Sequence, residues 1–174
     1  MITKKIILSL IFVSITSTAI IIPVVYNPDL DYKFALELIQ KASERIIIGN
    51  MSISFDAFLW RDFMPGVEEG GTGIYAAIVI TATNVSLFPS YINCNEMWVV
   101  NFGQSDWIPE ETPQVEMWNT KLEHIGIEDN TLQKRADNGP KWDIGIILHV
   151  IIELSKLGGQ KYYLWIQTEL EATY

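Results

Sequence analysis

The stretch that decides the fold is residues 143–174, with the sequence DIGIILHVIIELSKLGGQKYYLWIQTELEATY. Apolar residues alternate with mixed ones on both sides of a glycine pair, which predicts one long β-hairpin. Because successive side chains of a strand point to opposite faces, one face of this hairpin should lie in the core. The residues of that face are Ile144, Ile146, Leu148, Val150, Ile152 and Leu154 on the first strand and Tyr162, Leu164, Ile166, Thr168, Leu170 and Ala172 on the second.

The turn of the hairpin sets which residues face one another. A two-residue loop, Gly158-Gly159, would place the apolar face of one strand against the more polar face of the other. A three-residue loop, which adds Leu157, places Leu154 opposite Tyr162 and makes one face apolar throughout. Since register follows the buried face, and since Gly159 suits the left-handed position of such a loop, the sequence favours the three-residue loop.

Length and composition allow one domain with a hydrophobic core. The chain has 174 residues, of which 49% are hydrophobic and 19% charged, so a disordered chain is excluded. The net charge of −9 argues against binding to nucleic acid, and against charge-driven binding to anionic lipid head groups. The single cysteine, Cys94, excludes a disulfide framework and a multi-cysteine metal site, and we expect it to be a buried, inert thiol.

The N-terminal segment, residues 1–25, decides the expected compartment. Residues 6–25 carry no charge and would form a helix about 30 Å long, which matches the thickness of a bilayer core. Lys4 and Lys5 precede them, so the positive-inside rule puts the N-terminus in the cytoplasm and the domain outside. The sequence favours a retained single-pass membrane anchor. The alternative is a signal peptide that is cleaved near Ala19, which would make the domain a secreted one.

Residues 26–44 are expected to connect this segment to the folded domain. Apolar positions within residues 32–43 recur at helical spacing, which predicts a brief helix, with a first strand as the alternative. Such a helix could serve as a stalk that lifts the domain off the membrane.

The folded domain is expected to span residues 45–174 and to be all-β. Alternating runs separated by turn residues predict about six or seven strands. An antiparallel β-sandwich, immunoglobulin-like in outline, would bury such strands, and a small barrel or jelly roll is the alternative. Besides the hairpin, strands are expected at 45–48, 51–60, 74–83, 95–102 and within 121–127, and irregular structure at 103–118 and 129–142.

The sequence contains none of the common motifs of catalytic or cofactor sites. A GxSxG elbow, HExxH, a Walker loop, GxGxxG, CxxC and an EF-hand loop are all absent. We therefore expect a protein that is not an enzyme and that has no cofactor and no metal site. Carboxylates such as Asp56 and Asp62 are abundant, so a small hydrolase with paired carboxylates is the least favoured alternative.

Aromatic residues and one arginine are the candidate binding residues. Trp107, Trp118 and Trp142 fall in expected loops, where indole rings can stack on sugars or anchor a protein partner. Such residues more often fold inward and cap the ends of a sandwich. Trp60 and Arg61 are neighbours in an apolar run, where Arg61 either ties a strand end to a nearby loop through an ion pair or recognises a ligand together with Trp60.

The favoured function is a module of the cell envelope that is anchored or exported and acts by protein–protein contact. The alternative is recognition of carbohydrate or of a cell surface through the loop tryptophans. Asn50 and Asn84 stand in N-glycosylation sequons, which would be used only in a host that glycosylates exported proteins.

Overall fold

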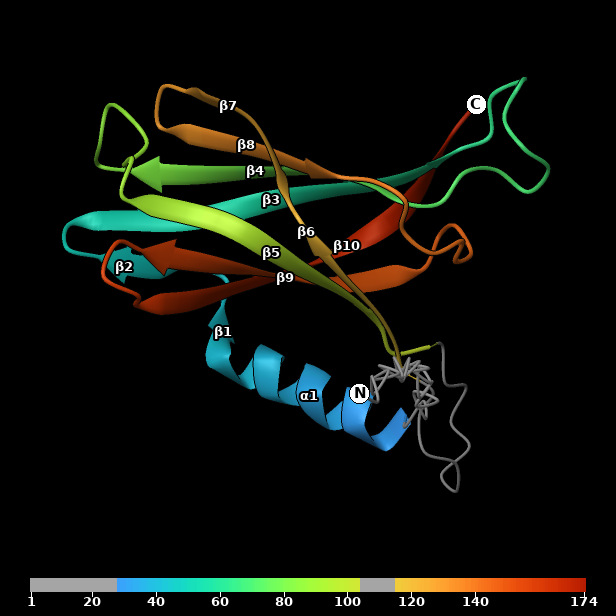
Figure 1. Ribbon diagram of the computed structural model, residues 1–174, viewed down its shortest axis with the longest axis horizontal. Coiled ribbons are helices and arrows are strands. Elements are labelled where there is room, and N and C mark those ends of the chain that lie inside the picture. The colour runs from blue at the N-terminus through green and yellow to red at the C-terminus, as the bar shows by residue number, and fades with distance from the viewer. Residues whose placement is uncertain (1–27, 104–114) are drawn as a thin grey trace, which may run out of the picture.

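The computed structural model describes residues 28–103 and 115–174, which form one helix and ten strands. The strands make a curled, mixed sheet, so the prediction of a mostly β fold is confirmed (Figure 1). The order along the sheet is β6-β5-β9-β10-β3-β4-β8-β7, with β1 beside β10 and β2 beside β3. The elements are α1 (Pro28–Lys41), β1 (Ala42–Ser43), β2 (Ile46–Ile48), β3 (Met51–Asp62), β4 (Tyr75–Thr83), β5 (Ile92–Asn101), β6 (Glu116–Lys121), β7 (Glu123–Glu128), β8 (Thr131–Ala136), β9 (Ile147–Lys156) and β10 (Lys161–Thr173).

The hairpin β9–β10 has the register predicted for a three-residue loop. Leu154 pairs with Tyr162, and the Lys156 amide donates to the Gln160 carbonyl over 2.8 Å. Gly159 has a φ of 89°, a backbone conformation that favours glycine. The apolar faces of the two strands therefore meet on one side of the sheet, as the alternation requires.

The main hydrophobic core lies inside the curl of the sheet. Strands β9 and β4 supply much of it from opposite parts of the sheet, through side chains that are fully buried. The hairpin was expected to start at residue 143, but β9 begins at Ile147. The chain turns at Gly145, which has a φ of 81°, and Ile144 is exposed. The fully buried side chains that these two strands and the residue before β4 contribute to the main core are Ile74, Ala76, Ile78, Ile80, Ala82, Leu148, Val150, Ile152 and Leu154.

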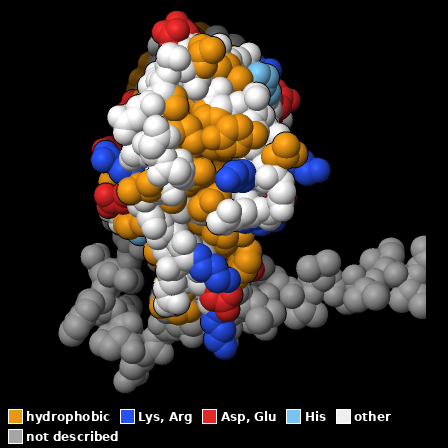
Figure 2. All heavy atoms as spheres, turned by 90° about the vertical axis from the view of Figure 1, so that its left-hand side faces the viewer, with side chains coloured by type: hydrophobic (Ala, Val, Ile, Leu, Met, Phe, Trp, Pro, Cys, Tyr) orange, Lys and Arg blue, Asp and Glu red, His pale blue; other side chains and the backbone are white. Residues whose placement is uncertain are grey.

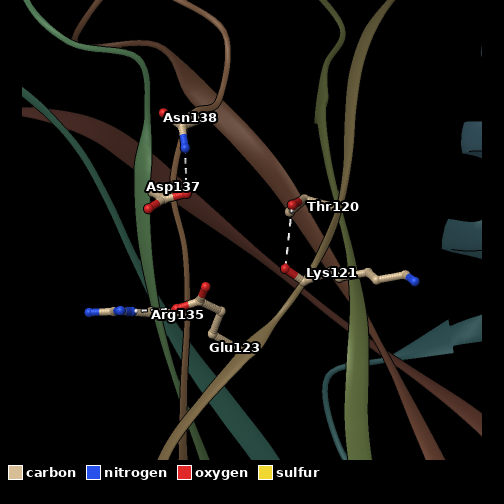
Figure 3. Close-up of polar contacts among 6 residues, drawn as sticks. All are labelled: Thr120, Lys121, Glu123, Arg135, Asp137 and Asn138. Atoms are coloured by element: carbon tan, nitrogen blue, oxygen red, sulfur yellow. Dashed lines mark hydrogen bonds and ion pairs between the residues drawn. The ribbon is translucent and has the colours of Figure 1, made fainter.

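Strands β6 and β7 join the two ends of the sheet path. They follow one another in the chain with only Leu122 between them, yet β6 pairs with β5 and β7 pairs with β8. Figure 1 shows this run crossing the other strands diagonally. The Leu122 amide donates to the Asn95 carbonyl over 2.9 Å, and Arg135 of β8 forms an ion pair of 2.9 Å with Glu123 of β7 (Figure 3). The covalent chain thus links both edges of the curled sheet.

Two features of the predicted sheet are wrong. The sheet is not antiparallel throughout, because β10 runs parallel to both β1 and β3. Strand β8 lies in a part of the chain that was expected to be irregular, and the expected loop residue Trp118 belongs to β6. The inward-facing side chains of β8 are Leu132, Lys134 and Ala136. The lysine among them interrupts the apolar alternation by which a buried strand face is recognised in a sequence.

The expected helix is present as α1, but it is not a stalk. Ala35 and Leu38 of α1 are buried in a second cluster, against Trp98 of β5 and Ile151 of β9 on the outer face of the sheet. The helix is therefore part of the domain. The expected anchor, residues 6–25, lies outside the described residues. Within the part of the chain that is described, no helix has the length and apolar character needed to span a membrane.

Candidate functional site

Arg61 is a buried structural residue at the end of β3. It is 6% exposed, its Nε donates to the Thr72 carbonyl over 2.8 Å, and its Nη1 donates to the Trp142 carbonyl over 2.7 Å. Its Nη2 donates to the Gly70 carbonyl, and the guanidinium lies over the Phe63 ring at 4.9 Å. The expected tie between a strand end and neighbouring loops is present. It is made through backbone carbonyls, and among the described residues Arg61 has no ion pair.

Trp60 points to the opposite face of β3 from Arg61. Its ring stacks on Tyr75 of β4 with a centroid distance of 5.6 Å and lies 5.3 Å from the ring of Phe58. These three rings form a row on the outer face of the sheet, where Phe58 is exposed. Trp60 and Arg61 therefore cannot act on the same ligand. The Arg61 side chain is buried and bonds to backbone carbonyls, whereas the Trp60 ring lies on the outer face of the sheet.

Two of the candidate loop tryptophans lie close together. Trp142 is 9% exposed and packs on the core, as a residue that caps the end of the sheet would. Trp118 of β6 is partly buried against the same core. Together with Asp31 and Glu116 they line a pocket of about 390 Å³. Trp107 lies outside the described residues.

Cys94 is buried, as expected from the sequence. Its side chain is fully buried in the main core, and burial raises the pKa of its thiol to about 12. Lys134, which is 5% exposed, opposes this rise through its charge, and burial lowers the pKa of that lysine. A thiol with such a pKa stays protonated at neutral pH, which makes Cys94 inert as a nucleophile.

His149 lies in an aromatic setting on the outer face, beside α1. Its ring stacks on Trp165 with centroids 5.8 Å apart and meets the edge of Phe102 at 4.9 Å. Its Nε2 is 3.1 Å from Nε2 of Gln167, and its buried Nδ1 has no hydrogen-bond partner among the described residues. Burial lowers the pKa of His149, so the ring is neutral at pH 7.

Metal ligands and sequons give little further chemistry. Within residues 28–103 and 115–174, no three histidine, cysteine, aspartate or glutamate side chains gather as a metal site would require. Asn50 and Asn84 are both exposed, in the turns that follow β2 and β4, and the Asn84 amide donates to the Asn50 carbonyl over 3.1 Å.

A surface that sequence reasoning missed lies at the end of the molecule formed by the β2–β3, β4–β5 and β9–β10 turns. Large hydrophobic side chains are exposed there, and we call them the apical patch. Figure 2 views this end and shows hydrophobic side chains (orange) at the surface, with basic ones (blue) beside them. The apical patch consists of Ile47 (74% exposed), Leu87 (66%), Tyr91 (42%) and Leu157 (84%).

Tyr91 contacts one other member of the apical patch and two residues next to the patch. Its carbonyl accepts a hydrogen bond from the Leu157 amide over 2.8 Å, and its hydroxyl lies 4.0 Å from the sulfur of Met51, beside β2. Lys156 places its Nζ 6.0 Å from the centre of the Tyr91 ring. The signal for this surface is present in the sequence, because residues 84–91 and 157–160 carry no charge although they form turns.

No protein-family model, no curated protein and no solved structure matches this chain.

Proposed function

We propose that this chain is a binding module of the cell envelope that holds a partner protein at its apical patch. One observation carries the proposal: four large hydrophobic side chains are exposed at one end of the molecule, on strand β2 and on the β4–β5 and β9–β10 turns. Exposed apolar patches of this kind mark interaction sites on soluble domains. The turns around them are free of charged residues at 84–91 and 157–160, and a depletion of charge is typical of the centre of a protein–protein interface.

The position of the apical patch agrees with an N-terminal attachment. In Figure 1 the turns that carry the patch lie at the left end, whereas α1 begins toward the right. Residues 6–25 form a single-pass anchor in this proposal, with the N-terminus in the cytoplasm, and the domain then presents the patch away from its point of attachment. Cleavage near Ala19 would instead release the module with the same patch.

The proposal also includes the architecture of the domain, which we take to be a β-sandwich that is immunoglobulin-like in outline. One layer would contain β6, β5, β9 and β10, and the other would contain β3, β4, β8 and β7. The packing of β9 and β4 side chains into one core supports two facing layers.

Site-specific photo-cross-linking tests the function. A photoreactive residue replaces Leu157 in the full-length chain, in its native membranes, and the adducts are identified by mass spectrometry. The matched control replaces Ile147, which is exposed at 53% but begins the strand that Leu157 follows. We expect one defined protein adduct at position 157 and none at position 147. Equal patterns at both positions, or no adduct at 157, would refute the proposal.

A further inference from the structure

Strand β10 has an open stretch in the middle of one edge. On this edge, β1 pairs with Tyr163 and Leu164, and β3 pairs with residues 170–173. Between them, residues 165–169 have no strand partner among the described residues on the side away from β9. Strand β3 has the mirror arrangement on the side away from β4, because β2 covers residues 51–53, β10 covers residues 59–62, and residues 54–58 have no strand partner there in the part of the chain that is described. The two strands thus diverge and leave an opening in the sheet.

The opening is closed at both ends. At one end, residues 44–45 connect β1 to β2, so that the chain passes from β10 to β3. At the other end, the Thr168 hydroxyl donates to the Ala57 carbonyl over 3.2 Å. Between these limits lies a groove of about 510 Å³, which we call the fork groove. Its volume is in the range of about 300–1,000 Å³ found for small-molecule sites.

Backbone groups of both strands point into the fork groove. The Leu170 amide donates to the Ile146 carbonyl, so the even-numbered residues of β10 bond to β9. The odd-numbered residues, including Trp165 and Gln167, therefore turn their N–H and C=O groups toward the groove. On β3, the Ala57 carbonyl accepts from Thr168, so Phe55 turns its backbone groups the same way. The groove thus offers, on both walls, backbone donors and acceptors that have no strand partner in residues 28–103 and 115–174.

The side chains that line the fork groove also supply both hydrogen-bond donors and hydrogen-bond acceptors. Arg45 supplies donors, Glu44 and Asp56 supply acceptors, and Gln167 supplies both. The amide of Gln167 is held by its 3.1 Å contact with His149, and the Trp165 indole provides an aromatic wall. Charges of both signs are present, so the groove does not select a strongly charged ligand.

We propose that the fork groove binds a neutral saccharide of one or two sugar units. Each hydroxyl of a sugar both donates and accepts hydrogen bonds, which matches walls that carry donors and acceptors in alternation. An extended peptide matches less well, because it needs a continuous edge, whereas this edge is covered by β1 and β3 at either side. The site involves neither the loop tryptophans nor the apical patch, so it stands or falls separately from the proposed function.

Saturation-transfer difference NMR on the full-length protein tests the proposal. The probes are glucose, galactose, N-acetylglucosamine and cellobiose, with trilysine as a peptide probe. The variants Asp56→Ala and Gln167→Ala each remove one polar side chain, the first from the β3 wall of the groove and the second from the β10 wall. The matched control is Glu171→Ala, which removes an exposed acidic side chain further along β10.

We expect a saturable signal from at least one sugar, weakened about tenfold or more in both groove variants and unchanged in the control. The absence of a signal from every sugar at tens of millimolar would overturn the proposal, as would sugar binding by Asp56→Ala and Gln167→Ala as strong as that of the unsubstituted protein. Binding of trilysine that depends on Asp56 while the sugars give no signal would assign the groove to basic peptides instead. Circular dichroism of each variant shows whether a lost signal reflects a lost fold.

Discussion

Replacing Arg61 by alanine tests whether this residue holds two loops to the end of β3. The guanidinium donates to carbonyls of Gly70, Thr72 and Trp142, and its bond to Trp142 is fully buried. A hydrogen bond from a charged donor contributes about 1.5–3 kcal/mol, and an acceptor left unpaired in the interior adds a desolvation cost. Since the other two bonds are only partly buried, we expect Arg61→Ala to lower the free energy of unfolding by about 3–5 kcal/mol.

Urea denaturation with linear extrapolation gives the measurement. Arg61→Lys keeps the charge but lacks the planar fork that reaches several carbonyls, so it should lose a large share of the same stability. The control is Arg135→Ala, because the ion pair of Arg135 with Glu123 joins side chains that are 60% and 64% exposed. Such a pair contributes about 0–1 kcal/mol. If Arg61→Ala costs no more than Arg135→Ala, the three carbonyl contacts do not hold the loops and the reasoning is wrong.

Three further predictions follow from burial. Ile152→Asp should unfold the domain, because it places an unpaired charge at a fully buried position, whereas Glu171→Gln should leave the melting temperature unchanged; thermal unfolding compares them. His149 has a lowered pKa, so the folded state binds fewer protons than the unfolded chain, and stability should fall as pH drops below about 6.5. His149→Gln should flatten this dependence in melting curves recorded across that range. The Cys94 thiol, with a pKa of about 12, should react with Ellman's reagent only after urea unfolds the chain, and a fast reaction in buffer would contradict its burial.

Local alternation was enough to predict the long elements and their buried faces. The register of β9 and β10 followed from requiring Leu154 and Tyr162 to share an apolar face, and the structure has that pair. The same alternation also predicts that the side chains of Trp60 and Arg61 lie on opposite faces of the sheet, because adjacent residues of a strand point to opposite faces. The sequence alone therefore already favoured the structural role of Arg61 over a ligand that it shares with Trp60.

Pairings between distant segments could not be predicted. Leu59 lies beside Leu170 in a parallel pair, although nothing in either strand specifies its neighbour across the sheet. Strand β8 was missed because Lys134 occupies an inward position and breaks the apolar pattern. The meeting of Trp118 and Trp142 in one pocket likewise depends on how β6 crosses the sheet, which is a property of the whole fold.

The fork groove shows both what the sequence could predict, the strands themselves, and what it could not, the pairing between them. Both of its walls were expected as strands, and so was β2, but their divergence results from the insertion of β1 and β2 between them, and the sequence does not show where these two short strands pair. Strands that paired along their whole length would satisfy every backbone group on the facing edges. Here residues 54–58 and 165–169 have no strand partner on the facing edges among the described residues. The backbone groups that point into the groove, apart from the Ala57 carbonyl that accepts from Thr168, are therefore left to water or to a ligand. A ligand rich in hydroxyl groups can replace several such waters at once, and this is why we assign a saccharide to the groove.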